Sequence, residues 1–273
     1  MECREPYRLR TLAERLHEGS VLAAMLMLAL ALQWNLASAS APTAAIGRTY
    51  LPLIASPACA PILGESYAAV SLTGTHPALA AEVHPDLNLA VRGYAPTSAE
   101  LSLVDYGGGA DPGAPQLDDL LSNGTASFGA AYQVFEWDWD KMHRGPRIAS
   151  PSVTALGLNV RRGETLHVPA SGYTIGEGWE VLVLYASDER ITLKYTREDN
   201  VVYGYTLHVE DACIEPRLLA LYEVCEAAGR TCLPALHERQ AFGRARADQV
   251  VVAIRDHGCF LDPRSRKDWW QGY

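Results

Sequence analysis

Strand-forming segments dominate the second half of the chain. Residues 181–185, 191–196 and 201–209 are rich in aliphatic, β-branched and aromatic side chains, which favour β-strands. Turn-forming residues at 187–190 and 198–200 separate the three runs. The pattern therefore predicts an antiparallel meander with hairpin-length connections.

One helix and one further strand are predicted after the meander. Residues 215–228 have the composition of a helix, in which Pro216 suits the first turn and Gly229 suits the C-terminal cap. Residues 249–255 are a predicted strand with an apolar run at 250–254. We therefore expect a mainly β fold with one inserted helix.

The preceding part of the chain is predicted to contain further short strands. Residues 87–91 and 99–104 are apolar runs of strand length, and the glycine-rich residues 107–113 predict a loop. We divide the folded part of the chain into a β-rich N-terminal region at 65–145 and a β domain at 146–273.

Residues 135–140 alternate strictly between three aromatic residues and three acids. In a strand, the aromatic side chains lie on one face and the carboxylates on the other. The simplest interpretation is a strand with its aromatic face in the core and its acids in water. The alternatives are a sugar-stacking platform, because aromatic faces stack on sugars, or a calcium site, because carboxylate oxygens suit calcium.

The N-terminus has the layout of a secretory signal peptide. Several arginines precede the apolar run 21–32, and Ala-Ser-Ala at 37–39 resembles a cleavage site. We therefore expect residues 1–39 to be a signal peptide and the Ala-, Pro- and Ser-rich residues 40–64 to be an extended spacer. The alternative is an uncleaved membrane anchor, although the run is shorter than the roughly 20 residues that span a bilayer.

Net charge limits the partners of the protein. The chain of 273 residues has 23 basic and 32 acidic residues, which gives a net charge of -9 at pH 7. Nucleic acid and anionic membrane surfaces both attract basic patches, so neither is expected as the main partner. Membrane contact is expected only through the signal segment, if it is uncleaved.

Cysteine usage agrees with export, because bridges persist in oxidising compartments. Two cysteines lie close together at the predicted helix end, and two others follow predicted strands. Removal of residues 1–39 leaves five of the six cysteines, so one is odd. The spacer cysteine is the simplest choice for it, and five reduced thiols are the alternative. The two at the helix end are Cys225 and Cys232, the two that follow strands are Cys213 and Cys259, and the spacer cysteine is Cys59.

Two segments resemble the lysostaphin-type peptidoglycan endopeptidases, a zinc family with the duplicated hybrid motif. Residues 163–172 read G-E-T-L-H-V-P-A-S-G, and residues 250–258 read V-V-V-A-I-R-D-H-G, followed by L-D-P at 261–263. The family reads G-x-x-[VI]-x-A-P-A-D-G and H-L-H-F-E-[IV]-R-x-x-G-x-x-[VI]-[DN]-P at these places. The resemblance covers about 110 of the residues and implies a small β barrel or sandwich.

The same resemblance implies that zinc is not bound in the family manner. The family holds zinc with the His and Asp of H-x-G-x-D and with the second His of H-x-H. Those ligand positions fall at Val153, Gly157 and Val251, and the first His of H-x-H falls at Gln249. A catalytic zinc needs three ligands of the His, Asp, Glu or Cys kind, which these residues do not supply.

Two histidines are weak catalytic candidates. His208 ends the segment Y-T-L-H, which resembles the family strand Y-A-H-L that carries a non-ligand catalytic His. The Tyr of that segment is one position out of step, and a structural role for His208 is the simpler interpretation. His167 and His208 could also meet across strands beside Glu164 or Glu210 and form a new metal site.

Two functions of different class follow from these observations. The first is a secreted protein without catalytic activity or cofactor, whose degenerate peptidase-like β domain binds a cell-wall component, another envelope component or a surface protein. Family members without the zinc ligands act in this way, some as activators of cell-wall amidases. The alternative is a secreted cell-wall hydrolase with a relocated zinc site.

Overall fold

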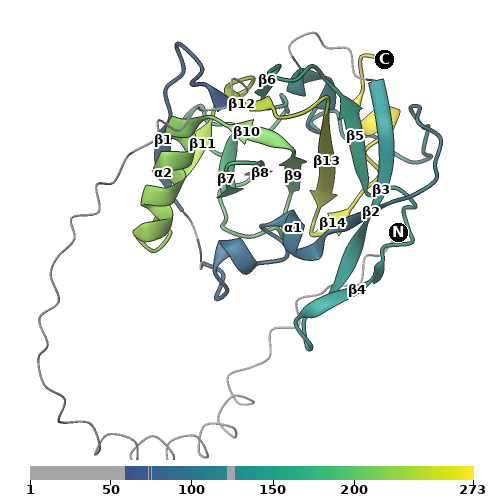
Figure 1. Ribbon diagram of the computed structural model, residues 1–273, viewed down its shortest axis with the longest axis horizontal. Helices are drawn as coiled ribbons and strands as arrows, with labels where there is room; N and C mark the ends of the chain where they lie inside the picture. The colour runs from purple at the N-terminus through teal and green to yellow at the C-terminus, as the bar shows by residue number, and fades with distance from the viewer. Residues whose placement is uncertain (1–58, 73, 75, 122–126) are drawn as a thin grey trace, which may run out of the picture. The chain divides into compact units, whose positions relative to one another are not determined.

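The computed structural model describes residues 59–72, 74, 76–121 and 127–273. Within them the chain is mainly β, with an eleven-stranded and a three-stranded antiparallel sheet and a few short helices (Figure 1). The predicted signal peptide and most of the predicted spacer lie outside these residues.

The strands of the larger sheet come from most of the described chain. They are β1 (Ala68–Ser71), β2 (Tyr94–Pro96), β3 (Ser127–Asp138), β4 (His143–Arg147), β5 (Ala155–Asn159), β7 (Val181–Ala186), β8 (Arg190–Lys194), β9 (Tyr205–Glu210), β11 (Cys232–Leu236), β13 (Gln249–Asp256) and β14 (Cys259–Phe260). Their order is β1-β11-β7-β8-β9-β13-β5-β3-β2, with β14 beside β13 and β4 beside β3.

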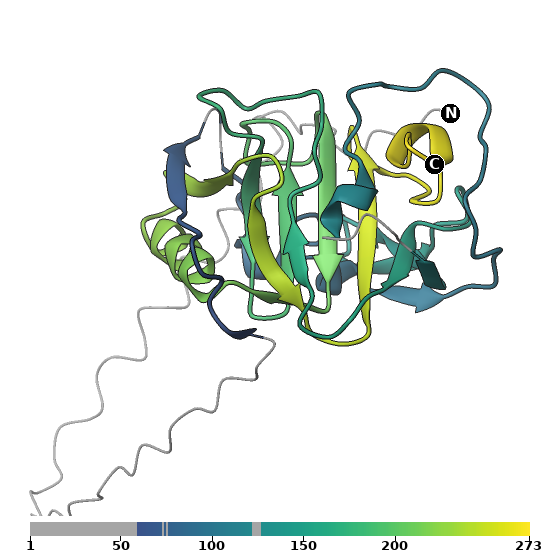
Figure 2. The same cartoon turned by 90° about the horizontal axis from the view of Figure 1, so that it is seen from above.

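The smaller sheet and the helices surround this sheet. The smaller sheet has the order β10-β12-β6, and α2 and α3 lie at opposite ends of the larger sheet (Figures 1 and 2). The bounds are β6 (Thr165–His167), β10 (Ala212–Ile214), β12 (Ala241–Ala245), α1 (Leu89–Arg92), α2 (Pro216–Ala227) and α3 (Arg266–Trp269), with 3-10 helices at Ala81–Val83 and Leu117–Leu120.

The predicted meander, inserted helix and last strand are confirmed, but the third strand of the meander begins at Tyr205 rather than at Val201, so its connection from β8, residues 195–204, is longer than the predicted hairpin turn. β7, β8 and β9 pair in sequence order, and β13 covers the predicted run 249–255. α2 begins at Pro216, and the carboxylate of Glu215 accepts hydrogen bonds from the backbone N–H groups of Arg217 and Leu218. This capping satisfies donors that the first turn of a helix leaves unpaired.

Two predicted strands are wrong. Residues 87–91 overlap α1 instead, because the Asn88 side chain accepts the N–H of Ala90 and caps a short helix that ends before Gly93. Gly93 has a φ of 69°, a left-handed conformation that ends a helix readily. Residues 99–104 make only an isolated bridge, between Val104 and Ser265.

The strand order of the larger sheet is open. β1 and β2 are its two ends, and no pairing among the described residues closes the sheet into a barrel. The sheet takes strands from both of the predicted regions, 65–145 and 146–273.

β13 is buried on both faces. It lies between β9 and β5, and Val250, Val252 and Ile254 contribute to the main hydrophobic core. Side chains alternate along a strand, so Val251 and Ala253 point to the other face and join a second, smaller apolar cluster. This explains why 250–254 is a continuous apolar run rather than an alternating one.

One of the two disulfides between described residues differs from the pairing that the sequence suggested. Cys225–Cys232 joins α2 to β11, as its spacing indicated. Cys59 is not the odd cysteine, because it bridges to Cys213 across 154 residues. Cys259 is therefore not the partner of Cys213. The bridge ties Cys59, near the end of the predicted spacer, to β10, a contact that no local pattern in the sequence reveals.

We predict that the two bridges contribute unequally to stability. In the chain-entropy treatment, a bridge across 154 residues contributes about 5 kcal/mol and one across 7 residues about 2 kcal/mol. The double variant Cys59→Ser/Cys213→Ser should therefore lose more free energy of unfolding in urea than Cys225→Ser/Cys232→Ser. Equal losses would contradict the prediction.

Candidate functional site

Three of the four residues at the expected zinc positions lie together on β5 and β13. Gly157 and Val251 are register partners, and Gln249 pairs with Asn159 on the same two strands. The Gln249 side chain lies over Gly157, where a Cβ would approach its Cδ to 2.4 Å. Val153 is fully buried just before β5 begins.

The surroundings of these residues do not fit a zinc ion. Val251 belongs to an apolar cluster with Leu89, Val134, Ala155, Ala253 and Phe260. Gln249 is the polar group beside Gly157, and its Oε1 accepts the Tyr132 hydroxyl at 3.0 Å. The carboxylate beside Val251 is that of Glu210, its register partner on β9, and it is paired with Arg190. One carboxylate that is already ion-paired does not supply the three protein ligands of a catalytic zinc.

His208 lies one step further along the same face, on β9 beside β13. Its side chain is fully buried, and its Nδ1 lies 3.0 Å from the Thr192 hydroxyl. That hydroxyl donates its only hydrogen to the carbonyl of Leu87 at 2.6 Å, which assigns the His208 proton to Nδ1. The Nε2 atom of His208 is then an acceptor, and it has no partner among the described residues.

Burial keeps His208 neutral. Desolvation, with a smaller contribution from the positive charge of Arg255, lowers the pKa of His208 to about 3. A neutral imidazole with a bare Nε2 is chemically a base. Because the side chain is fully buried, this base does not reach the solvent.

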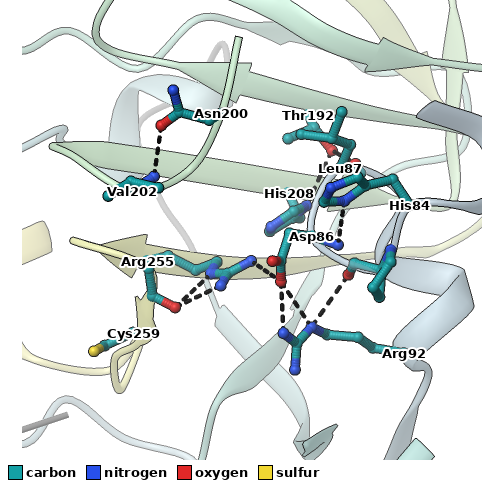
Figure 3. Close-up of polar contacts among 12 residues, drawn as sticks. His84, Asp86, Leu87, Arg92, Thr192, Asn200, Val202, His208, Arg255 and Cys259 are labelled. Atoms are coloured by element: carbon teal, nitrogen blue, oxygen red, sulfur yellow. Dashed lines mark hydrogen bonds and ion pairs between the residues drawn. The ribbon is translucent and has the colours of Figure 1, made fainter. Parts of the chain in front are cut away.

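A buried ion cluster covers His208 (Figure 3). Asp86 Oδ1 accepts from Arg92 Nη2 at 2.5 Å and from Arg255 Nη1 at 2.8 Å. The Nε and Nη2 atoms of Arg255 donate to the carbonyl of Gly258. The Phe260 ring lies 4.6 Å from the Arg255 carbon and 5.6 Å from that of Arg92, so it adds cation–π contacts. Through Asp86, these contacts hold the segment before α1 against β13.

Lys194 is a further buried cation beside this ion cluster. Lys194, Thr206 and Arg255 are register neighbours on β8, β9 and β13. The Lys194 ammonium donates to the carbonyls of Tyr203 and Gly204, and desolvation lowers its pKa to about 7. The roles of Asp86, Arg92 and Lys194 as buried ions could not be predicted from the sequence, because their segments carry no motif.

His167 is not brought to His208. It lies on β6 of the smaller sheet, paired with Ala241, whereas His208 is in the larger sheet. Glu164 accepts the backbone N–H of Arg161, and Glu210 is paired with Arg190. Within the described part of the chain, no three His, Cys, Asp or Glu residues are placed to hold a metal ion.

The aromatic strand is the end of β3, which pairs with β4 in a hairpin. Trp137 and Trp139 are half-buried, and Trp139 packs edge-on against His84 at 5.5 Å. Asp138 Oδ1 accepts two backbone N–H groups of the turn, and its Oδ2 pairs with Lys141. The carboxylate of Asp138 therefore stabilises the turn.

Comparisons with known proteins leave the resemblance untested. No protein-family model matches the chain, and no curated protein and no solved structure gives a significant match. Within 59–72, 74, 76–121 and 127–273, no helix is long and apolar enough to cross a membrane.

We predict a loss of stability in acid that depends on His208. The unfolded histidine takes up a proton below its ordinary pKa of 6.5, but the folded one resists protonation until about pH 3. The free energy of unfolding should therefore fall between these pH values, by about 1.4 kcal/mol per unit of pKa shift at most.

The variant His208→Gln should remove this part of the pH dependence in urea unfolding, since an amide can still donate to Thr192. The control His257→Gln changes a side chain that is 66 % exposed, and it should keep the wild-type profile. If both variants follow the wild-type profile, the buried neutral state of His208 is refuted.

Proposed function

We propose that this chain is an extracytoplasmic binding protein whose peptidase-like β domain has no zinc chemistry. One observation supports the proposal: Gly157, Gln249 and Val251, the residues that align with zinc-family positions, lie on neighbouring strands and offer an amide and aliphatic groups where that family has metal ligands. The motifs at 163–172 and 250–263 support descent from the lysostaphin-type barrel.

The expected compartment has separate support. Two disulfides are typical of proteins in oxidising compartments. The signal-like N-terminus supports secretion by the same route. A cell-wall or envelope component is the ligand class that best agrees with both the compartment and the resemblance.

A hydrolase with a relocated site is the second candidate. The observation that favours it is the bare Nε2 of His208, which could act as a base or as a metal ligand. Its burial beneath the Asp86 cluster argues against this role, because substrate and water would have to displace that cluster.

We predict that zinc stabilises the mature chain little. A ligand at 100 times its Kd stabilises a folded protein by about 2.7 kcal/mol, which raises the melting temperature of a domain of this size by several degrees. With zinc in excess, the melting temperature should instead shift by less than about one degree.

Co-sedimentation with insoluble peptidoglycan, and assay of soluble peptides released from it, completes the test. Binding without release supports the proposal. A large zinc shift that His208→Ala abolishes, together with peptide release, would establish the hydrolase instead.

A further inference from the structure

Exposed aromatic side chains gather where β9 begins and β13 ends. Tyr205 and Asp256 are register partners there, and the Tyr173 ring lies 6.0 Å from the Tyr205 ring. The Tyr203 ring lies edge-on to the His257 ring at 6.2 Å. We call these five residues the tyrosine surface. Tyr173 is 46 % and Tyr203 58 % exposed, so their apolar rings face solvent.

Two rings of this surface, those of Tyr173 and Tyr205, are held in place by Asp111. One carboxylate oxygen, Oδ2, accepts the hydroxyls of Tyr173 and Tyr205 at 2.8 Å each, and Oδ1 accepts the N–H of Gly113 at 2.8 Å. Tyr205 also packs edge-on against Trp269 at 5.6 Å. A ring that is ordered before binding loses little entropy when a ligand stacks on it.

Two glycines bring the supporting loops together. Gly172 donates its N–H to the carbonyl of Gly113 at 2.9 Å, and a Cβ on Gly172 would approach the Gly113 Cα to 2.8 Å. The loop that carries Asp111 can therefore approach the loop that carries Tyr173. The glycine that ends the motif at 163–172 thus positions the tyrosines.

The chemistry of the surface selects the class of ligand. Exposed tyrosine faces offer apolar contact, and their hydroxyls, the imidazole of His257 and the carboxylate of Asp256 offer hydrogen bonds. Asp111, Asp256 and the net charge of -9 disfavour anionic ligands. A pyranose ring presents apolar C–H faces and uncharged hydroxyls, which match such a surface.

We propose that the tyrosine surface binds a neutral saccharide. This inference rests on the proposed envelope-binding function and specifies its ligand and its site. It does not involve the buried face that carries His208 and Val251. Binding is by stacking on Tyr173 and Tyr203, with hydrogen bonds at Asp256 and His257.

The test is calorimetric titration of the mature chain with tetra-N-acetylchitotetraose. Tyr173→Ala and Tyr203→Ala should each weaken binding about tenfold or more, since tenfold corresponds to about 1.4 kcal/mol. The matched control is Tyr106→Ala, which also removes a tyrosine that is 44 % exposed and donates to a carboxylate, that of Asp262. It should bind as the wild type does.

Other outcomes would overturn the inference. No binding by the wild type, or equal loss in all three variants, excludes the tyrosine surface as a saccharide site. Binding of only the deacetylated, amine-bearing oligosaccharide, abolished by salt, would show charge attraction to Asp256 instead of stacking. Because Tyr203 is 58 % exposed and its side chain contacts the exposed His257 ring, Tyr203→Ala decides the matter if Tyr173→Ala fails to fold.

Sedimentation with insoluble peptidoglycan separates this inference from the proposed function. If wild-type chain sediments and Tyr203→Ala sediments equally, the function stands and the site is wrong. If the saccharide binds in solution but the wild type does not sediment, the site stands and the envelope-binding function is wrong.

Discussion

The pairing of Asp86 with Arg255 is the interaction on which the buried side of the sheet depends. Arg255 lies near the end of β13 and is 1 % exposed, while Asp86 is fully buried. Breaking such a pair by removing one partner costs about 3–5 kcal/mol, because the other charge stays buried without compensation. Asp86 also holds Arg92, so one carboxylate compensates two guanidinium groups and fastens the α1 segment to β13.

The same arrangement gives this face of the sheet an apolar part beside its ion pairs. Leu89 and Phe260 pack with Val251 in the smaller apolar cluster. Aliphatic side chains at such positions add buried apolar area, which stabilises a fold, whereas a set of metal ligands without metal would leave polar groups unsatisfied.

The parts of the fold set by local pattern were predictable. The meander and α2 follow from apolar runs, turn residues and a helix with Pro216 at its first turn. The run 87–91 shows the limit of such patterns, because the capping side chain of Asn88 selected a helix over a strand. The partner of Cys59 was beyond prediction for another reason, since pairing across 154 residues depends on the tertiary fold.

The candidate sites were predictable only in part. Gly157, Gln249 and Val251 do lie on neighbouring strands, and their proximity follows from the register of β5 and β13. Asp111 and Tyr205 are 94 residues apart and meet only because two loops pack at glycines, which no periodicity reveals.

The place of β13 in the chain has a consequence for how the protein folds. This strand pairs with β5 and β9, and it follows both of them in the sequence. The centre of the sheet therefore cannot form until β13 has been synthesised, and contacts so distant in sequence form slowly. Until then β5 and β9 are hydrophobic strands without their common partner, and unpaired strands of this kind favour aggregation.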